Sequence, residues 1–166
     1  MKLYHYAPCR NTIFKRGLFS FAGGYGEVDP YVKRAESSDR QKIIFWMEKT
    51  FPGRSHAISM LTEPIKWQNN DPMLKEFIDN HELFSIELDE LLKDNLVESI
   101  WCQDGERLSP VQPTEIDLSP LPWEKCNRER GLFFGVIRHY FIVLKNNVLP
   151  PRYIKTEKIY LDTPYK

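Results

Sequence analysis

Apolar and polar residues alternate, or apolar residues run together, in several short segments of this chain, and both patterns are typical of β-strands. The first such segment is LYHYA at 3–7, and its aromatic residues strengthen the prediction. The longest is LFFGVIRHYFIVL at 132–144, where the internal Gly135 predicts a bulge. Further strands are predicted at 56–61, 83–88, 96–101 and 158–161.

Apolar residues instead recur every three or four positions over 37–51, which predicts an amphipathic helix. Ser37 or Ser38 is its N-cap. Its apolar face carries Ile43, Ile44, Met47 and Phe51.

A second, shorter helix is predicted to follow the first strand. Asn11 is a favourable N-cap and Gly17 stands where helices commonly end. Proline at the start of a helical pattern predicts further helices after Asp29-Pro30 and over 71–80, and 89–94 is predicted to be a helical turn.

Helices come early in this order and strands come late, which favours an α+β protein. We expect a single domain over 1–166, with a mixed or antiparallel sheet and with helices mainly in the N-terminal half. A chain of 166 residues fits one domain. The proline-rich segment 103–131 has no clear period, so it is predicted to be a surface excursion of that domain.

Composition narrows the possible partners. The chain has 23 basic and 23 acidic residues, whereas a dedicated duplex-DNA-binding protein carries a basic excess. Cys9, Cys102 and Cys126 lack the spacing of a zinc site, so no metal is predicted and reduced thiols are expected. The apolar runs are too short to span a bilayer. We expect a cytoplasmic protein without a membrane partner; delivery into a host cell would leave no mark in this sequence.

His5 is the first candidate for chemistry, because it lies between two tyrosines on the predicted strand 3–7. Leu3 and His5 share one face of such a strand, and Tyr4 and Tyr6 share the other. A neutral imidazole offers one ring N–H to a ligand hydroxyl while its second nitrogen fixes the tautomer. The alternative is a histidine that packs in the core with its hydrogen bonds satisfied, or one that lies on the surface.

The opening segment LYHYAPCRNTIFKRGL resembles the first motif of the ADP-ribosyltransferase fold, in the branch that carries a histidine on its first strand. That branch includes the poly(ADP-ribose) polymerase catalytic domain, the RNA 2′-phosphotransferases and small bacterial toxins. Ile13 and Gly17-Leu18 match the helix of that motif. The resemblance implies that NAD is the substrate, that His5 bonds the ribose next to the nicotinamide, and that a toxin or effector modifies a macromolecular target, which we expect to be a protein.

Two later segments are similar to other parts of the same fold. AISMLTEPI at 57–65 is similar to the second motif, in which Ser59 and Thr62 would line the nicotinamide side. HYFIVLKNNVLPPRYI at 139–154 is similar in layout to the closing strands.

The third motif departs from the family pattern. Its usual glutamate stabilises an oxocarbenium-like transition state, but His139 or Tyr140 stands at that place. Glu98 is the candidate substitute catalytic residue; its alternative is a solvent-facing position on a strand. The resemblance also makes Tyr6, Tyr25 and Tyr140 candidate cofactor-binding residues. Without a carboxylate at the site, the protein would either use other polar groups or bind a nucleotide only.

Two further interpretations remain open. In PGRSHA at 52–57, Arg54 and His56 stand just before a predicted strand, either as paired donors for a phosphate or as part of a plain surface loop. Tryptophan is favoured at protein interfaces, so the alternative function is a non-enzymatic interaction or inhibitor protein that binds a partner through aromatic surface residues. The tryptophans are Trp46, Trp67, Trp101 and Trp123.

Overall fold

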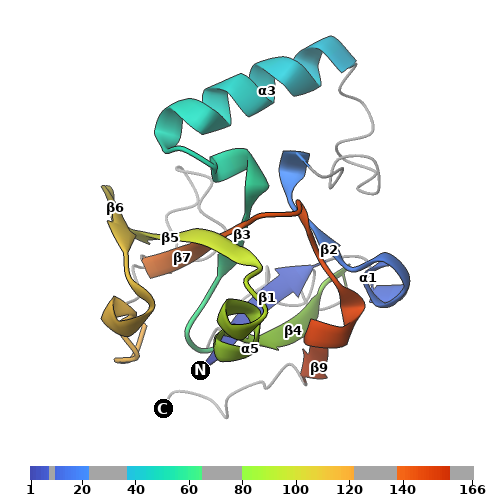
Figure 1. Cartoon of the computed structure of the whole chain (residues 1–166), viewed down its shortest axis with the longest axis vertical. Helices are drawn as coiled ribbons and strands as arrows, with labels where there is room; N and C mark the ends of the chain where they lie inside the picture. Colours follow the sequence, from blue (N-terminus) through green and yellow to red (C-terminus); the bar gives the residue numbers. More distant parts are fainter. Residues whose placement is uncertain (8–9, 23–36, 65–79, 122–137, 158–166) are drawn as a thin grey trace.

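The structure is a computed structural model that describes residues 1–7, 10–22, 37–64, 80–121 and 138–157 (Figure 1). The α-helices of these residues are α1 (Arg10–Arg16), α3 (Ser37–Thr50) and α5 (Leu88–Lys93). The strands are β1 (Lys2–Ala7), β2 (Leu18–Phe19), β3 (Ala57–Met60), β4 (Glu82–Glu87), β5 (Val97–Asp104), β6 (Arg107–Val111), β7 (Arg138–Leu144), β8 (Val148–Leu149) and β9 (Lys155–Glu157). Short 3-10 helices are η2 (Arg54–His56), η3 (Pro113–Glu115) and η5 (Pro151–Tyr153).

Two antiparallel sheets make up most of the fold. One has the strand order β1-β4-β9, the other has the order β3-β7-β5-β6, and β2 and β8 form a separate pair. A single bridge joins the two larger sheets: Tyr4 and Leu61 exchange both backbone hydrogen bonds, each at 2.8 Å. The prediction of a single-domain α+β protein with antiparallel pairing and early helices is confirmed.

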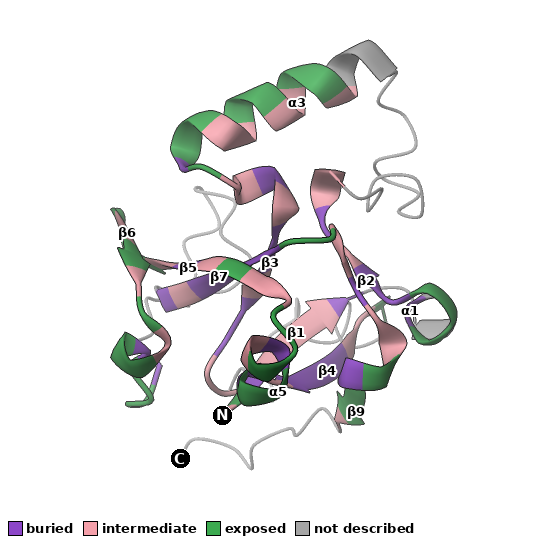
Figure 2. Ribbon diagram, viewed as in Figure 1, coloured by how far each residue is buried: buried purple, intermediate pink, exposed green. Residues whose placement is uncertain are grey.

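The hydrophobic core lies between the inner faces of these sheets. Alternate residues of each strand face it, as the period of two requires. They include Leu3, Phe84, Met60 and Ile142, all almost completely buried. Figure 2 shows the buried residues concentrated in the strands, below α3.

Helix α3 stands apart from the sheets (Figure 1). It forms where the sequence predicts a helix, but its predicted apolar face is only half-buried at Ile43, Ile44 and Met47. Phe45 and Trp46 are 64% and 66% exposed. The burial expected of an amphipathic helix is therefore largely missing from α3.

Glycine ends α1 as predicted. Gly17 has φ +92°, and its N–H donates to the carbonyl of Ile13 at 2.8 Å. The helix begins at Arg10, so Asn11 lies inside its first turn rather than at the N-cap. Strand β2 follows at once and pairs with β8, a two-residue ladder too short to show a period in the sequence.

The segment 103–131 contains regular structure in its described part, 103–121. Strand β5 continues to Asp104, the chain turns at Gly105, and β6 pairs with β5. Strand β6 is exposed or half-buried at every position, so its residues show no clear hydrophobic period. Beyond it, Ile116 and Leu121 are buried.

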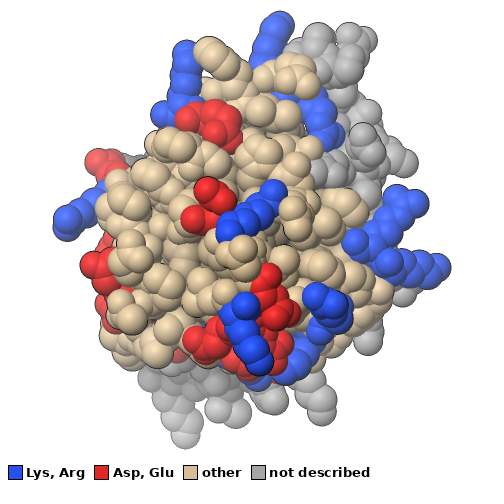
Figure 3. Space-filling model, viewed as in Figure 1, with Lys and Arg blue, Asp and Glu red and all other residues tan. Residues whose placement is uncertain are grey.

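Several predicted features lie outside the described residues, namely the helix after Asp29-Pro30, most of 71–80, the first half of 132–144 with its bulge, and the strand 158–161. Charges of both signs are interspersed on the face in Figure 3, with acidic side chains gathered near α5. There the N-terminal amine of Met1 pairs with Asp89 and Glu87. Among the described residues, no helix is long and apolar enough to span a membrane.

Candidate functional site

His5 lies where the two large sheets meet. Its ring nitrogen Nδ1 is 2.7 Å from the backbone carbonyl oxygen of Ser59 on β3. In the β1–β4 ladder it stands opposite Phe84, which in turn contacts Phe14 of α1 edge-to-face at 6.0 Å between ring centroids. The His5 side chain is therefore bonded to β3 and lies beside β4.

This hydrogen bond fixes the chemistry of the imidazole. Burial lowers the pKa of His5, the bond to the Ser59 carbonyl opposes that shift, and the neighbouring His81 lowers the pKa further. The ring is therefore neutral near pH 7. Because a carbonyl oxygen only accepts, Nδ1 carries the hydrogen and Nε2 is left as an acceptor. With Nδ1 bonded to the Ser59 carbonyl, the nitrogen that could face a ligand is Nε2, which accepts a hydrogen bond rather than offering the N–H expected from the sequence.

The two residues predicted in the second motif are Ser59 and Thr62. Ser59 lies on β3, the strand that bonds His5, and Thr62 follows shortly after that strand. Ser59 contributes its backbone carbonyl to the histidine, while its side-chain position belongs to the opposite face, in line with Phe141 on β7. Thr62 follows the Tyr4–Leu61 bridge. Its hydroxyl Oγ1 is buried and has no hydrogen-bond partner among the described residues.

The three candidate tyrosines have different surroundings. Tyr6 is half-buried on β1, on the face opposite to His5. Tyr140 is 1% exposed and packs in the core, where its hydroxyl accepts the backbone N–H of Asp117 at 2.8 Å. Tyr25 lies outside the described residues. The structure thus gives Tyr140 a packing role and does not bring it to His5 as a free ligand group.

The structure does not bring Glu98 to His5. Glu98 is exposed at an irregularity of β5, and β7 separates β5 from β3. Glu82 is the carboxylate that the ladders place on the same face as His5. It opposes Ala7, two residues along β1, and opposed residues of an antiparallel pair share a face.

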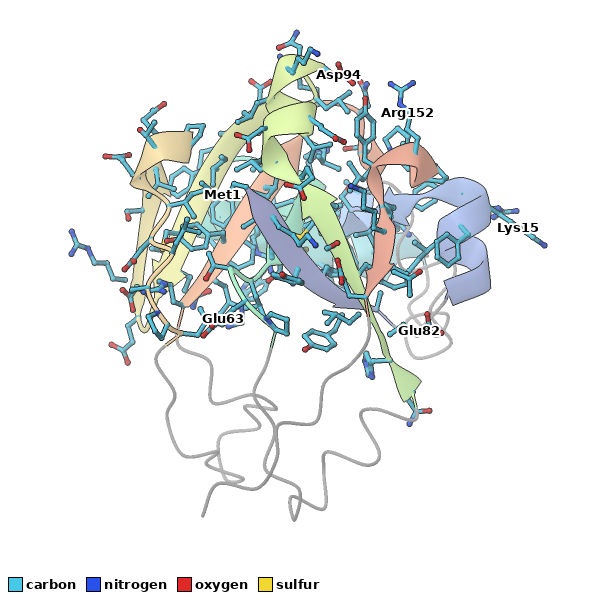
Figure 4. The ribbon with its side chains drawn as sticks, turned by 90° about the horizontal axis from the view of Figure 1, so that it is seen from below. Met1, Lys15, Glu63, Glu82, Asp94 and Arg152 are labelled. Atoms are coloured by element: carbon cyan, nitrogen blue, oxygen red, sulfur yellow. The ribbon has the colours of Figure 1, made fainter. Side chains whose placement is uncertain are left out.

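Figure 4 shows Glu82 at the start of β4, on the far side of β1 from Glu63. The predicted strand begins at Leu83, so Glu82 lies just outside it, and its register with β1 has no signal in the sequence. Among the described residues, no three His, Cys, Asp or Glu side chains are grouped in a way that would hold a metal ion.

The fold has a known counterpart. The chain is similar to Thermosipho africanus DarTG in complex with ADP-ribose, with a TM-score of 0.51 and 13% sequence identity. The similarity covers 93% of this chain and 42% of the DarTG chain, so this chain spans less than half the length of that protein. At this identity the similarity shows a shared fold. No protein-family model and no curated protein matches the sequence.

Proposed function

We propose that this protein binds NAD through its ADP-ribose part and transfers ADP-ribose to a macromolecular target, with protein as the first class to test. The observation that carries the proposal is the bond between His5 Nδ1 and the Ser59 carbonyl. It leaves Nε2 of a neutral ring as a fixed acceptor for a ribose hydroxyl. The shared fold with a protein that binds ADP-ribose supports the same ligand class.

The reaction requires little from the protein beyond placement and charge. The bond between ribose C1′ and the nicotinamide nitrogen breaks, and its electron pair leaves with neutral nicotinamide. Positive charge develops on the ribose, a nucleophile of the target forms the new bond to C1′, and the nucleophile loses its proton. Glu82, on the same face as His5, is the carboxylate we assign to stabilise that charge.

The test separates binding from transfer. His5→Asn retains a side-chain N–H for the Ser59 carbonyl but removes the Nε2 acceptor. We expect calorimetry to show weaker ADP-ribose binding by about fivefold or more, because a lost hydrogen bond costs about 1 kcal/mol or more. His56→Asn is the matched control, since His56 bonds Asn147 rather than Ser59. Equal affinity in wild type and His5→Asn contradicts the proposal.

Transfer is followed with labelled NAD and a cell lysate. Wild type is expected to label a macromolecule, and nuclease or protease digestion of the product identifies its class. Glu82→Gln is expected to bind ADP-ribose as wild type does and to lose label. Transfer by Glu82→Gln at the wild-type rate removes Glu82 from the mechanism.

A second candidate function rests on α3. Phe45 and Trp46 are neighbouring, strongly exposed aromatic residues, and such residues are typical of protein interfaces. A non-enzymatic interaction protein would show no thermal shift with NAD or ADP-ribose. Trp101, a tryptophan considered for this role, instead stacks on Phe51 at 4.7 Å between ring centroids. Trp67 and Trp123 lie outside the described residues.

A further inference from the structure

Helix α3 is held to the rest of the protein near both of its ends. Near its start, Arg40 donates a hydrogen bond to the backbone carbonyl of Phe21 at 2.7 Å. Near its end, the Glu48 carboxylate accepts the N–H of Gly53 at 2.8 Å and that of Ser55 at 3.0 Å. These contacts determine which face of the helix is turned away from the sheets.

The outward face of α3 carries aromatic and basic side chains together. Residues three, four and seven positions apart lie on one face of a helix. Four exposed residues have this spacing, and we call them the α3 outer face: Lys42, Phe45, Trp46 and Lys49. The two rings are 64% and 66% exposed, and the Nζ atom of Lys49 lies 4.3 Å from the centroid of the Phe45 ring. Figure 2 shows exposed and half-buried positions alternating along this helix.

The positive charge of the α3 outer face is not compensated. Neither Lys42 nor Lys49 has an acidic partner among the residues that the structure describes. Glu48, a carboxylate of the same helix, is instead turned toward η2 by its bonds to Gly53 and Ser55. Adjacent exposed aromatic residues are typical of an interaction site, and cations beside them favour a partner that carries carboxylates.

Like charges argue against a second copy of this chain as that partner. In an antiparallel pairing of two α3 helices centred on Phe45 and Trp46, Lys42 of one copy would face Lys49 of the other. In a parallel pairing, each lysine would face its own equivalent. Both arrangements bring like charges together, which is unfavourable at an interface. The α3 outer face is therefore suited to a partner of opposite charge.

The arrangement of the four side chains also argues against a membrane surface and against nucleic acid. A helix that lies in a membrane interface has apolar residues on one face and basic residues on the other, whereas both lysines of the α3 outer face lie on the same face as the rings. Proteins that bind single-stranded nucleic acid hold it in a basic groove. The α3 outer face is instead the convex surface of one helix. A protein segment that carries carboxylates is the partner that fits it.

We infer that the α3 outer face binds an acidic segment of another protein that also carries apolar residues. Phe45 and Trp46 pack against apolar side chains of that segment, and Lys42 and Lys49 pair with carboxylates on either side of them. With a rise of 1.5 Å per residue, the two lysines are about 10 Å apart along the helix, so the carboxylates of the partner have about this separation. The inference deepens the second candidate function by giving the chemistry of its partner, and it requires nothing of His5.

The test begins with a library of short random peptides that is displayed on phage and selected on the wild-type protein. We expect the selected peptides to carry acidic residues next to apolar ones. Lys42→Glu/Lys49→Glu should weaken the binding of such a peptide about tenfold or more, because two attractions become repulsions. Lys15→Glu/Lys93→Glu is the matched control, since it makes the same change in net charge at two exposed lysines of α1 and α5. Exchanging the acidic residues of the peptide for lysine should restore its binding to Lys42→Glu/Lys49→Glu.

A measurement on the wild-type protein covers the case in which a variant does not fold. Hydroxyl radicals oxidise exposed aromatic rings, and mass spectrometry locates the oxidised residues. The selected peptide is expected to slow oxidation of Phe45 and Trp46 but not of Phe14, which is 40% exposed on α1. Selected peptides without acidic residues, or without protection of Phe45 and Trp46, overturn the inference.

Three further measurements identify the other occupants: binding to vesicles of phosphatidylcholine with phosphatidylserine, binding to a single-stranded oligonucleotide, and sedimentation of the protein alone. Vesicle binding, oligonucleotide binding or self-association that is lost in Phe45→Gln/Trp46→Gln assigns the α3 outer face to that occupant and overturns the inference. Failure here leaves the binding of ADP-ribose, tested with His5→Asn, unaffected. A protein that binds acidic peptides on α3 but binds no ADP-ribose retains this inference and loses the proposed transferase function.

Discussion

Two substitutions of His5 distinguish the contribution of its bond to the Ser59 carbonyl from the contribution of its other ring nitrogen, Nε2. His5→Ala leaves the Ser59 carbonyl without its donor and removes a packed ring. An unsatisfied buried acceptor costs about 1–3 kcal/mol. His5→Asn keeps a donor at the equivalent atom. We therefore expect His5→Ala to be less stable than His5→Asn by about 1–3 kcal/mol, which is roughly 2–4 °C in melting temperature for each kcal/mol.

The same histidine makes stability depend on pH in a defined window. Because burial lowers its pKa in the folded protein, the unfolded chain binds more protons between that lowered value and about 6.5. Stability is therefore full above about pH 6.5 and falls as pH drops below it. This component should disappear in His5→Asn, whose side chain does not titrate.

Urea unfolding at about pH 7.5 and about pH 5.5 measures both effects on wild type, His5→Asn and His5→Ala. His56→Asn serves again as the control for loss of a histidine elsewhere. Equal stability of the two His5 variants would show that the Ser59 bond contributes nothing. A pH dependence that survives in His5→Asn would assign the titration to another group.

Further predictions concern single side chains around this framework. Gly17→Ala should destabilise the fold by about 2 kcal/mol or more, because Gly17 has φ +92° and the added Cβ would meet a backbone carbonyl of β8. Gly105→Ala, at φ +60° with open space around it, should cost only about 1 kcal/mol. Thermal melts compare the two variants. Burial raises the pKa of Glu48, but hydrogen bonds from Ser55 and its neighbours outweigh burial, so the net shift of the pKa is downward. The ionised Glu48 therefore stabilises the folded protein above about pH 4.5, and this contribution is lost as pH falls through the lowered pKa. Glu48→Gln should therefore reduce stability near pH 7 and flatten the acid limb of urea unfolding. Tyr140→Phe should cost about 1 kcal/mol in the same assay, because a backbone N–H loses its acceptor at 2.8 Å.

The sequence predicts the local structure better than the pairing. Alternation identifies β1, and short apolar runs identify β4 and β7 because these two strands are buried on both faces. The C-terminal end of α1 is predicted from Gly17. The pattern for β6 is weak because this five-residue edge strand has no fully buried position. For α3 the pattern is present but burial does not follow, since amphipathicity does not say which surface a helix covers.

The same difference between local structure and strand pairing applies to the candidate site. The position of His5 on a strand follows from its aromatic neighbours, but its tautomer depends on a carbonyl 54 residues away in sequence. The prediction of Glu98 rests on its strand position alone, and the strand order, which places β7 between β5 and β3, is not contained in that position. Register with β1 favours Glu82 instead, and register between distant strands cannot be deduced from one sequence.

The pairing of β1 has a consequence for synthesis on the ribosome. β1 is made first, but its ladder partner β4 begins at Glu82 and its bridge partner is Leu61. At about 5–20 residues per second, the aromatic first strand waits several seconds for these partners. The second edge of β4 is covered only when β9, at Lys155–Glu157, has emerged. The nascent chain therefore carries an unpaired aromatic strand until β4 has emerged, and a chaperone that holds extended apolar segments would find its binding site in the same residues that later position His5.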